Sequence, residues 1–358
     1  MKFLRLSIIC MGIVLPLSQA GPCGQNRRDL GRGLLPHGCP APTADNIPTP
    51  SPSPEDNNKI DKRSSDGEKP SASEDDNKDS DGDSGNNQPS TGGNDVPNGA
   101  GNGKCEFPWK EANGDNVILI TPDKKNAGWA MSPDQSCEKN GWCPYACAPG
   151  YYSAQWDPNA KDPSGPGSMN GGLFCDGSGK LSKPFPEKPF CEKGMWNGFI
   201  KNTLGESVSA CQTIYPGNEA MLIPTVAKPG ESVAMNIVPN SYWLGTSSQF
   251  YVNLAGSDGS KCIWGDDKQP IGNWGPYIFG GGQSKDGNTY ISVQFNPLYK
   301  EKGFDLSKVY SVEIKCTSGK CNFPEPGECK CKAGGQCSVE NGCTVTLPPG
   351  ATADWVLS

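Results

Sequence analysis

From residue 105 onward, hydrophobic and polar side chains alternate over short stretches. The clearest stretches, rich in β-branched and aromatic residues, are 116–121 (NVILIT), 232–238 (SVAMNIV), 248–254 (SQFYVNL), 289–295 (TYISVQF), 309–315 (VYSVEIK) and 342–347 (GCTVTL). Alternation with a period of two is typical of half-buried β-strands. Turn-forming residues separate them, and Asp286, Gly287 and Asn288 predict a turn before one strand. Residues 195–204 fit a short helix. The pattern predicts an all-β fold, a β-sandwich or a β-barrel.

The first 104 residues have a different pattern. An apolar run over residues 6–17 follows Lys2 and Arg5 and precedes the small residues Ser18 and Ala20, which predicts a secretory signal peptide over residues 1–20. A membrane anchor is the alternative, but roughly twelve apolar residues are fewer than the ~20 that span a bilayer. Residues 41–104 have no aromatic residue and few large apolar ones, so this stretch should be disordered.

A dibasic pair, Lys62 and Arg63, lies within that stretch. Such a pair in accessible chain is a candidate site for a processing protease, and the alternative is two ordinary surface cations. We favour processing, which divides the chain into a signal peptide (1–20), a pro-segment (21–63), a disordered acidic linker (64–104) and a cysteine-rich domain (105–358).

Cysteines support export. Loss of Cys10 with the signal peptide leaves sixteen, and an even number in an oxidising compartment indicates disulfides, with Cys23 paired to Cys39 and fourteen cysteines in the domain. Zinc binding is the alternative for the crowded cysteines at 316–343. The only histidine, His37, lies outside the domain, and paired C-x-x-C motifs do not occur. Disulfides are therefore favoured, and we expect no metal or other cofactor.

The lack of histidine in the domain also limits its chemistry. It excludes a Ser-His-Asp triad and a Cys-His pair, and leaves carboxylates, hydroxyls, amides and aromatic rings. The net charge of −7 comes largely from residues 55–104, which hold twelve acidic and six basic residues. The sequence shows no basic patch with interleaved aromatics and no long apolar segment after the signal peptide, so we expect neither a nucleic acid nor a membrane partner.

Aromatic and acidic residues of the domain suit carbohydrate chemistry. All nine tryptophans and all ten tyrosines lie there, and their faces can stack on sugar rings or fill the core. Glycoside hydrolysis commonly needs two carboxylates beside the scissile bond. The candidates, in aromatic or cysteine-anchored contexts, are Asp157, Asp176, Glu192, Glu219, Asp266 and Asp267. For each of them the alternative is an exposed, solvated charge.

Five motifs in collinear order make the chain similar to a known family. They are 143–156 (CPYACAPGYYSAQW), 171–175 (GGLFC), 211–225 (CQTIYPGNEAMLIPT), 249–256 (QFYVNLAG) and 262–276 (CIWGDDKQPIGNWGP). These motifs resemble the fungal SUN family. The resemblance implies a secreted glycosidase that acts on cell-wall β-glucan, especially β-1,3-linked, in wall remodelling, septation and cell separation. The run of cysteines at 316–343 exceeds the family pattern and indicates a divergent branch.

The candidate site residues follow from these two lines together. We predict Glu219, Glu192 and Asp157 as catalytic carboxylates, Glu219 first because it lies within a family motif. Trp156, Tyr215, Trp264 and Trp274 are predicted to bind sugar. A non-catalytic glucan-binding or structural wall protein with the same aromatic residues is the main alternative. A thaumatin-like antifungal or effector-type scaffold is a third hypothesis, and a thaumatin-like arrangement is also a candidate for the fold.

Overall fold

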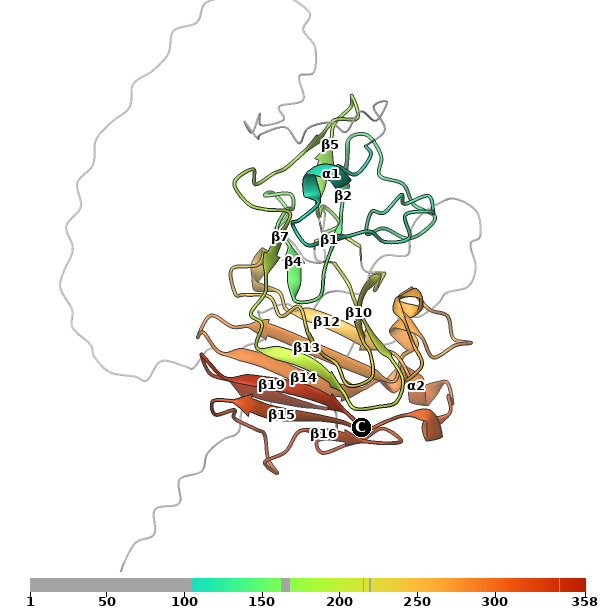
Figure 1. Ribbon diagram of the computed structural model, residues 1–358, viewed down its shortest axis with the longest axis vertical. Coiled ribbons are helices and arrows are strands. Elements are labelled where there is room, and N and C mark those ends of the chain that lie inside the picture. The colour runs from blue at the N-terminus through green and yellow to red at the C-terminus, as the bar shows by residue number, and fades with distance from the viewer. Residues whose placement is uncertain (1–104, 162–167, 215, 219, 341) are drawn as a thin grey trace, which may run out of the picture. The chain divides into compact units, whose positions relative to one another are not determined.

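The computed structural model describes residues 105–161, 168–214, 216–218, 220–340 and 342–358 (Figure 1). The predicted signal peptide, pro-segment, linker and dibasic site lie outside these residues, and so do Tyr215 and Glu219. Among the described residues, strands are far more numerous than helices, so the predicted all-β fold is confirmed. No helix in this part of the chain is both long and apolar enough to cross a membrane.

Two sheets make up the C-terminal part of the described chain. The first has the order β10 (Ile223–Ala227), β9 (Val208–Gln212), β12 (Ser248–Val252), β13 (Tyr277–Gln283), β14 (Thr289–Phe295) and β18 (Cys343–Leu347). The second has the order β11 (Ser232–Ala234), β8 (Gly198–Asn202), β19 (Thr352–Leu357), β15 (Val312–Ser318), β16 (Lys330–Lys332) and β17 (Gln336–Cys337). Neighbouring strands are antiparallel, except that β19 pairs with β8 in parallel.

The two sheets pack face to face, which makes the fold a β-sandwich. One continuous core contains Phe250 and Phe279 from the first sheet and Ile200 and Trp355 from the second, all fully buried. The rings of Phe279 and Trp355 stack across the sheets with centroids 5.3 Å apart, and Figure 1 shows β13 and β14 layered against β19 and β15. Burial of each such side chain stabilises the fold by about 1.5–3 kcal/mol.

Most of the predicted strands are present. β12, β14 and β18 fall within 248–254, 289–295 and 342–347, and the turn at 286–288 joins β13 to β14. In this turn Asp286 accepts the amide hydrogen of Asn288, and Gly287 has a φ of 84°. The other three are shorter or shifted: β1 (Val117–Ile118), β11 and β15 cover only part of the predicted ranges.

The predicted helix at 195–204 was wrong. Residues 198–202 form β8, where burial alternates so that Gly198, Ile200 and Asn202 are buried and Phe199 and Lys201 are less so. Pairing with β19 and β11 on either side satisfies the backbone of this strand, so tertiary contacts override a weak local preference.

Strand β13 escaped prediction because it contains three successive glycines. An ideal Cβ at Gly280 would lie 2.8 Å from Ser292 Oγ, at Gly281 3.0 Å from Ile237 Cγ1, and at Gly282 2.8 Å from the Ser247 Cβ. Neighbouring segments therefore approach this strand too closely for side chains, which explains glycines that otherwise weaken a strand.

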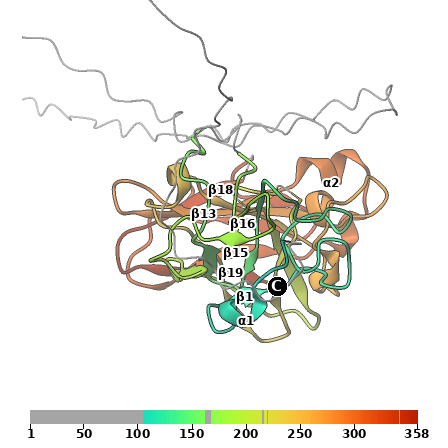
Figure 2. The same ribbon diagram turned by 90° about the horizontal axis from the view of Figure 1, so that it is seen from above.

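Short strands and turns make up the part of the chain before residue 194. β2 (Gly141–Cys143) pairs with β5 (Leu173–Cys175), which pairs with β6 (Leu181–Ser182). β1 pairs with β3 (Ala146–Cys147), and β4 (Tyr151–Ser153) with β7 (Cys191–Lys193). The described helices are α1 (Trp109–Ala112) and α2 (Pro297–Glu301), with 3₁₀ turns at Trp243–Gly245, Gly259–Lys261, Gly272–Trp274 and Leu306–Lys308. α2 directly follows β14 and lies to one side of the strands (Figure 2).

Disulfides join these elements. The fourteen cysteines of the described chain pair as 105–175, 137–143, 147–191, 211–262, 316–321, 329–343 and 331–337. The sulfurs of Cys105, Cys137 and Cys175 lie within 4.8 Å of one another because two disulfides are adjacent there. The seven disulfides confirm the prediction that the domain cysteines pair.

Candidate functional site

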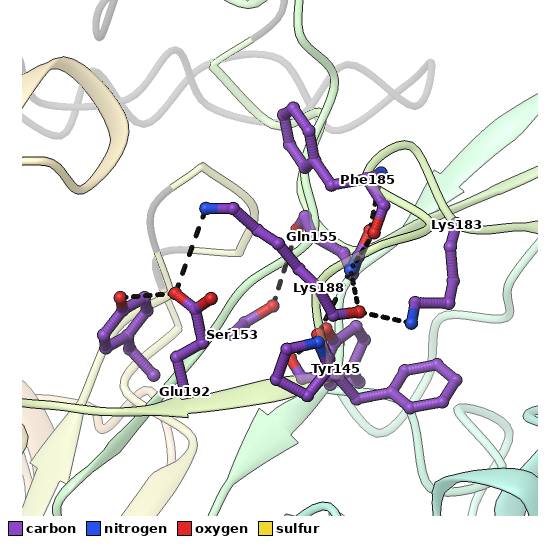
Figure 3. A network of polar contacts seen from close by, with 10 residues as sticks. Tyr145, Ser153, Gln155, Lys183, Phe185, Lys188 and Glu192 are labelled. Carbon is purple, nitrogen blue, oxygen red and sulfur yellow. Dashed lines mark hydrogen bonds and ion pairs between the residues drawn. The ribbon is translucent and has the colours of Figure 1, made fainter. Parts of the chain in front are cut away.

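Glu192 lies on β7 directly opposite Tyr152 of β4. Residues paired in this way present their side chains on the same face of the two strands. The Tyr152 hydroxyl donates a hydrogen bond of 2.6 Å to Glu192 Oε2. The Lys188 ammonium lies 3.9 Å from the same oxygen, and Figure 3 shows Lys188 directed toward Glu192. The Glu192 side chain is 28% exposed, so the carboxylate remains within reach of solvent. The neighbouring disulfide Cys147–Cys191 fixes the start of β7.

The two partners of this carboxylate, Tyr152 and Lys188, contact a cluster of aromatic rings. Tyr242 makes edge-to-face contacts with Tyr152 at 5.2 Å and with Trp156 at 5.4 Å, and Trp156 makes another with Phe185 at 5.1 Å. Lys188 Nζ lies 5.2 Å from the Trp156 ring, so one ammonium contacts both the aromatic cluster and Glu192. Trp156 is only 9% exposed and packs mainly against these neighbours.

A buried amide holds the segment that supplies Lys188 and Phe185. The Gln155 side chain donates to the carbonyl oxygens of Phe185, Lys188 and Pro189 and accepts the amide hydrogen of Phe185 (Figure 3). The ammonium of Lys183 also donates to the carbonyl of Lys188. Because Gln155 is only 1% exposed, these bonds are poorly replaced by water, and the segment should be rigid.

The electrostatics keep a proton donor beside the carboxylate. Burial, and then the hydrogen bond to Glu192, raise the pKa of Tyr152 well above its usual value near 10, so the phenol stays protonated at physiological pH. Burial likewise raises the pKa of Tyr242. The site thus combines a neutral phenol, an ammonium and a carboxylate, a set that can bind sugar hydroxyls and hold a carboxylate in one orientation.

A small cavity adjoins the cluster. It has a volume of about 20 Å³, and Tyr152, Tyr242, Gln212, Thr213 and Asn236 are among its lining residues. Asn236 is 6% exposed; its Nδ2 donates to Gln212 Oε1 at 3.2 Å, but its Oδ1 is buried without a partner. A cavity of this size with polar walls has room for about one water molecule.

The loop that carries Tyr215 and Glu219 starts at this cavity. Those two residues lie outside the described chain, but Thr213, Ile214 and Ile223 line the cavity. Gly217 N–H donates to the carbonyl of Ser168 at 3.0 Å. The residues at the two ends of this loop thus line the same cavity as Tyr152.

Asp157 and Asp176 accept hydrogen bonds from nearby residues. Asp157 accepts from Asn159 N–H through one oxygen and from Asn170 Nδ2 through the other, both at 2.8 Å. Asp176 accepts from Ser178 and Lys180 in the turn between β5 and β6, and the Ser178 hydroxyl is the main cause of its lowered pKa.

Trp264, Asp266, Asp267 and Trp274 lie on the loop after Cys262. Asp266 accepts from Lys268 N–H, and Asp267 forms a 3.0 Å ion pair with Lys302. Lys302 Nζ lies 5.4 Å from the half-buried Trp274 ring, and Trp264 is 56% exposed. The structure thus connects Trp156 and Glu192 through Lys188, whereas Trp274 contacts Lys302 and Trp264 is largely exposed.

Sequence reasoning did not single out Tyr242, Lys188 or Asn236 as site residues. Lys188 stands four residues before Glu192, a spacing that carries no signal outside a helix. Tyr242 and Asn236 reach the site only through the path of the chain after β11. The one usable signal was Cys191, since a disulfide next to an acidic residue fixes that residue's position.

The fold and the site together define a disulfide-braced, all-β protein with an acidic and aromatic surface site. Residues 100–345 match the family described as "Beta-glucosidase (SUN family)". The chain therefore belongs to the SUN family, as its motifs predicted, and its relatives' names agree that it is a secreted protein.

Several curated proteins are similar to this chain. It is 41% identical over 61% of its length to "Probable secreted beta-glucosidase adg3" of Schizosaccharomyces pombe, covering 19% of that protein. It is 40% identical over 60% of its length to "Uncharacterized protein YMR244W" of Saccharomyces cerevisiae, covering 61% of it. "Probable secreted beta-glucosidase PSU1" of S. pombe is 36% identical, with 60% and 50% covered. The chain thus spans less than two thirds of each of these relatives.

One solved structure, the thaumatin-like xylanase inhibitor TLXI, is 15% identical, with 45% of this chain and 97% of that chain covered and a TM-score of 0.27. The protein elicitor MoHrip2 from Magnaporthe oryzae gives the same TM-score at 11% identity. These scores assign no architecture, so a thaumatin-like arrangement stays a prediction.

Proposed function

We propose that this protein is a glycosidase that hydrolyses cell-wall β-glucan, with β-1,3-linked chains as the expected substrate, during wall remodelling and cell separation. Membership of a family described as β-glucosidases supports the reaction class. The observation that carries the proposal is the Glu192 carboxylate, held by Tyr152 and Lys188 beside Trp156 and Tyr242. Glycoside hydrolysis requires two carboxyl groups beside the scissile bond, and an oriented Glu192 would supply one of them.

Its surroundings assign Glu192 the role of nucleophile or general base. A phenol donor and a nearby ammonium both interact favourably with a negatively charged carboxylate. In a retaining reaction the carboxylate attacks the anomeric carbon as the glycosidic bond breaks, and water later releases the sugar from the ester. In an inverting reaction the carboxylate instead removes a proton from the attacking water.

A second carboxyl group must protonate the leaving oxygen. We assign this role to Glu219, because the described residues on both sides of it, Thr213, Ile214 and Ile223, line the cavity next to Tyr152. Asp157 is the second choice, since both of its oxygens already accept hydrogen bonds in a local turn. Trp156, Tyr215, Trp264 and Trp274 remain the proposed sugar-binding residues.

Release of reducing sugar from laminarin tests this assignment. Glu192→Gln and Glu219→Gln should each lower the rate at least about 100-fold, the usual range for removal of an acid–base group. Glu313→Gln is the matched control, because Glu313 is an exposed carboxylate on β15 that pairs with Lys315 at 3.3 Å. Equal rates for Glu192→Gln and the control would refute the role of Glu192.

Glucan binding without hydrolysis is the second candidate function. The exposed Trp264 favours it, because an indole that is 56% exposed on a disulfide-anchored loop offers an open face for a sugar ring. Retention of the protein on insoluble glucan, with no sugar released by the wild type, would support this function over catalysis.

A further inference from the structure

A groove lies at one end of the sandwich, where the start of β8, the hairpin of β13 and β14, and the turn before β19 meet. It has a volume of about 370 Å³, and its lining includes Trp196, Asn197, Gln283, Thr289 and Thr352. Ligand sites in proteins commonly have volumes of about 300–1,000 Å³, so the groove is large enough for roughly one or two sugar rings.

Trp196 has a backbone conformation that needs an explanation. Its φ is 50°, in the left-handed region, where a bulky side chain costs on the order of 1–3 kcal/mol. Core packing does not account for it, because Trp196 is 37% exposed. Strain of this kind at an exposed aromatic residue is characteristic of functional sites.

The indole is nevertheless held in one orientation. Trp196 Nε1 donates to the carbonyl of Gly150 at 2.9 Å, and Lys193 Nζ lies 4.1 Å from the ring centroid. Tyr151 contacts the ring edge-on at 6.0 Å. The strained backbone and these contacts together fix the ring at the edge of the groove, so a ligand would meet a pre-organised surface.

The polar side chains of the groove are neutral. Asn197 Nδ2 donates to Thr289 Oγ1 at 2.8 Å, which leaves Asn197 Oδ1 as a buried acceptor without a partner. A buried acceptor without a partner costs about 1–3 kcal/mol. Amides, hydroxyls and an aromatic ring suit a ligand that is uncharged and rich in hydroxyl groups.

The groove is separate from the Glu192 site, although the same two strands support both. Successive residues of a strand point to opposite faces. Tyr152 and Glu192 therefore share one face of the β4–β7 pair, and Tyr151 and Lys193, which contact Trp196, share the other.

We propose that this groove is an ancillary binding site for a neutral polysaccharide, with Trp196 stacking on a sugar ring beside Asn197, which lines the groove. The choice of β-1,3-glucan as the ligand rests on the proposed function. The binding site itself is inferred from the volume and lining of the groove and from the fixed Trp196 ring.

Retention on insoluble β-1,3-glucan, measured as a binding isotherm with the full chain, tests the proposal. Trp196→Gly is the main variant because glycine adopts a φ of 50° without strain, and Asn197→Ala is the second. Trp109→Ala is the control, since Trp109 is 39% exposed and lies on α1. We expect Trp196→Gly to weaken binding at least about tenfold and Asn197→Ala several-fold, with the control unchanged.

Wild-type affinity in Trp196→Gly, an equal loss in Trp109→Ala, or no binding by the wild type would each overturn the proposal. Hydrolysis enters none of these measurements. If the catalytic assignment is wrong, the protein releases no sugar but still binds glucan in a way that depends on Trp196.

Discussion

Removal of the Tyr152 hydroxyl measures how firmly the protein holds Glu192. Tyr152→Phe keeps the ring and its contact with Tyr242 and deletes the 2.6 Å hydrogen bond to Glu192 Oε2. Hydrogen bonds to charged groups contribute about 1.5–3 kcal/mol. Because the Glu192 side chain is 28% exposed, water replaces part of the lost bond, and we expect the free energy of unfolding to fall by about 1–2 kcal/mol.

The assay is denaturant unfolding with disulfides intact, repeated in the Glu192→Gln background. Bonds to a charged acceptor are roughly twice as strong as bonds to a neutral one, so the hydroxyl should stabilise the Glu192→Gln variant by about half as much as it stabilises the wild type. An equal loss in both backgrounds would show that the carboxylate charge contributes nothing. A loss below about 0.5 kcal/mol in the wild type would refute the inference that Tyr152 orients Glu192.

Three further predictions concern the fold. Burial raises the pKa of Tyr145 and Tyr242, so the folded protein holds these protons more tightly than the unfolded chain. The stability that these two residues contribute should be complete below pH about 10 and fall above it. Ionisation of these two tyrosines near pH about 10 in the folded protein, seen as tyrosinate absorbance without unfolding, would contradict this. Gly172 and Gly230 have the same φ of 80°, but an added Cβ would lie 2.0 Å from the Cys143 carbonyl oxygen at Gly172 and in open space at Gly230. In thermal unfolding, Gly230→Ala should lower the free energy of unfolding by about 1–2 kcal/mol, and Gly172→Ala by about 1–3 kcal/mol more. Equal losses in the two variants would exclude the steric explanation. Replacing both cysteines of Cys211–Cys262, which are 51 residues apart, should destabilise the folded protein by about 4 kcal/mol. Replacing both cysteines of Cys331–Cys337, which are 6 residues apart, should cost about 2 kcal/mol. The reverse order in chemical unfolding would refute the explanation by loop entropy.

Local pattern predicted those strands whose side chains alternate regularly. β12, β14 and β18 have buried residues at every second position for most of their length, which is the property that the sequence displays directly. β13 lacks side chains at three positions because Ile237, Ser247 and Ser292 approach it, and those residues come from other segments. β8 reads as a helix in isolation, and its parallel pairing with β19 joins residues more than 150 positions apart.

The site, like the strands, is only partly predictable from local sequence. Glu192 and Trp156 could be proposed from residue type and motif, but their common location depends on Tyr152, Tyr242 and Lys188. The bond between Tyr152 and Glu192 spans 40 residues, and its register is set by β4 pairing with β7. A sequence gives the types of the carboxylates and not their separation, so it does not distinguish Asp157 from Glu192. In the structure both oxygens of Asp157 accept hydrogen bonds from nearby residues.

The pairing of β4 with β7 joins the proposed catalytic carboxylate and the proposed polysaccharide-binding groove in one small element. Glu192 shares a face with Tyr152, which lines the cavity, and the next residue, Lys193, packs on Trp196 from the opposite face. The disulfide Cys147–Cys191 and the Gln155 amide brace this element, so the two faces cannot shift independently by much. An insoluble polymer bound at Trp196 would thus be held at a fixed position relative to Glu192. Loss of the Trp196 ring should then weaken action on insoluble glucan more than action on short soluble chains, because a short chain occupies one face at a time.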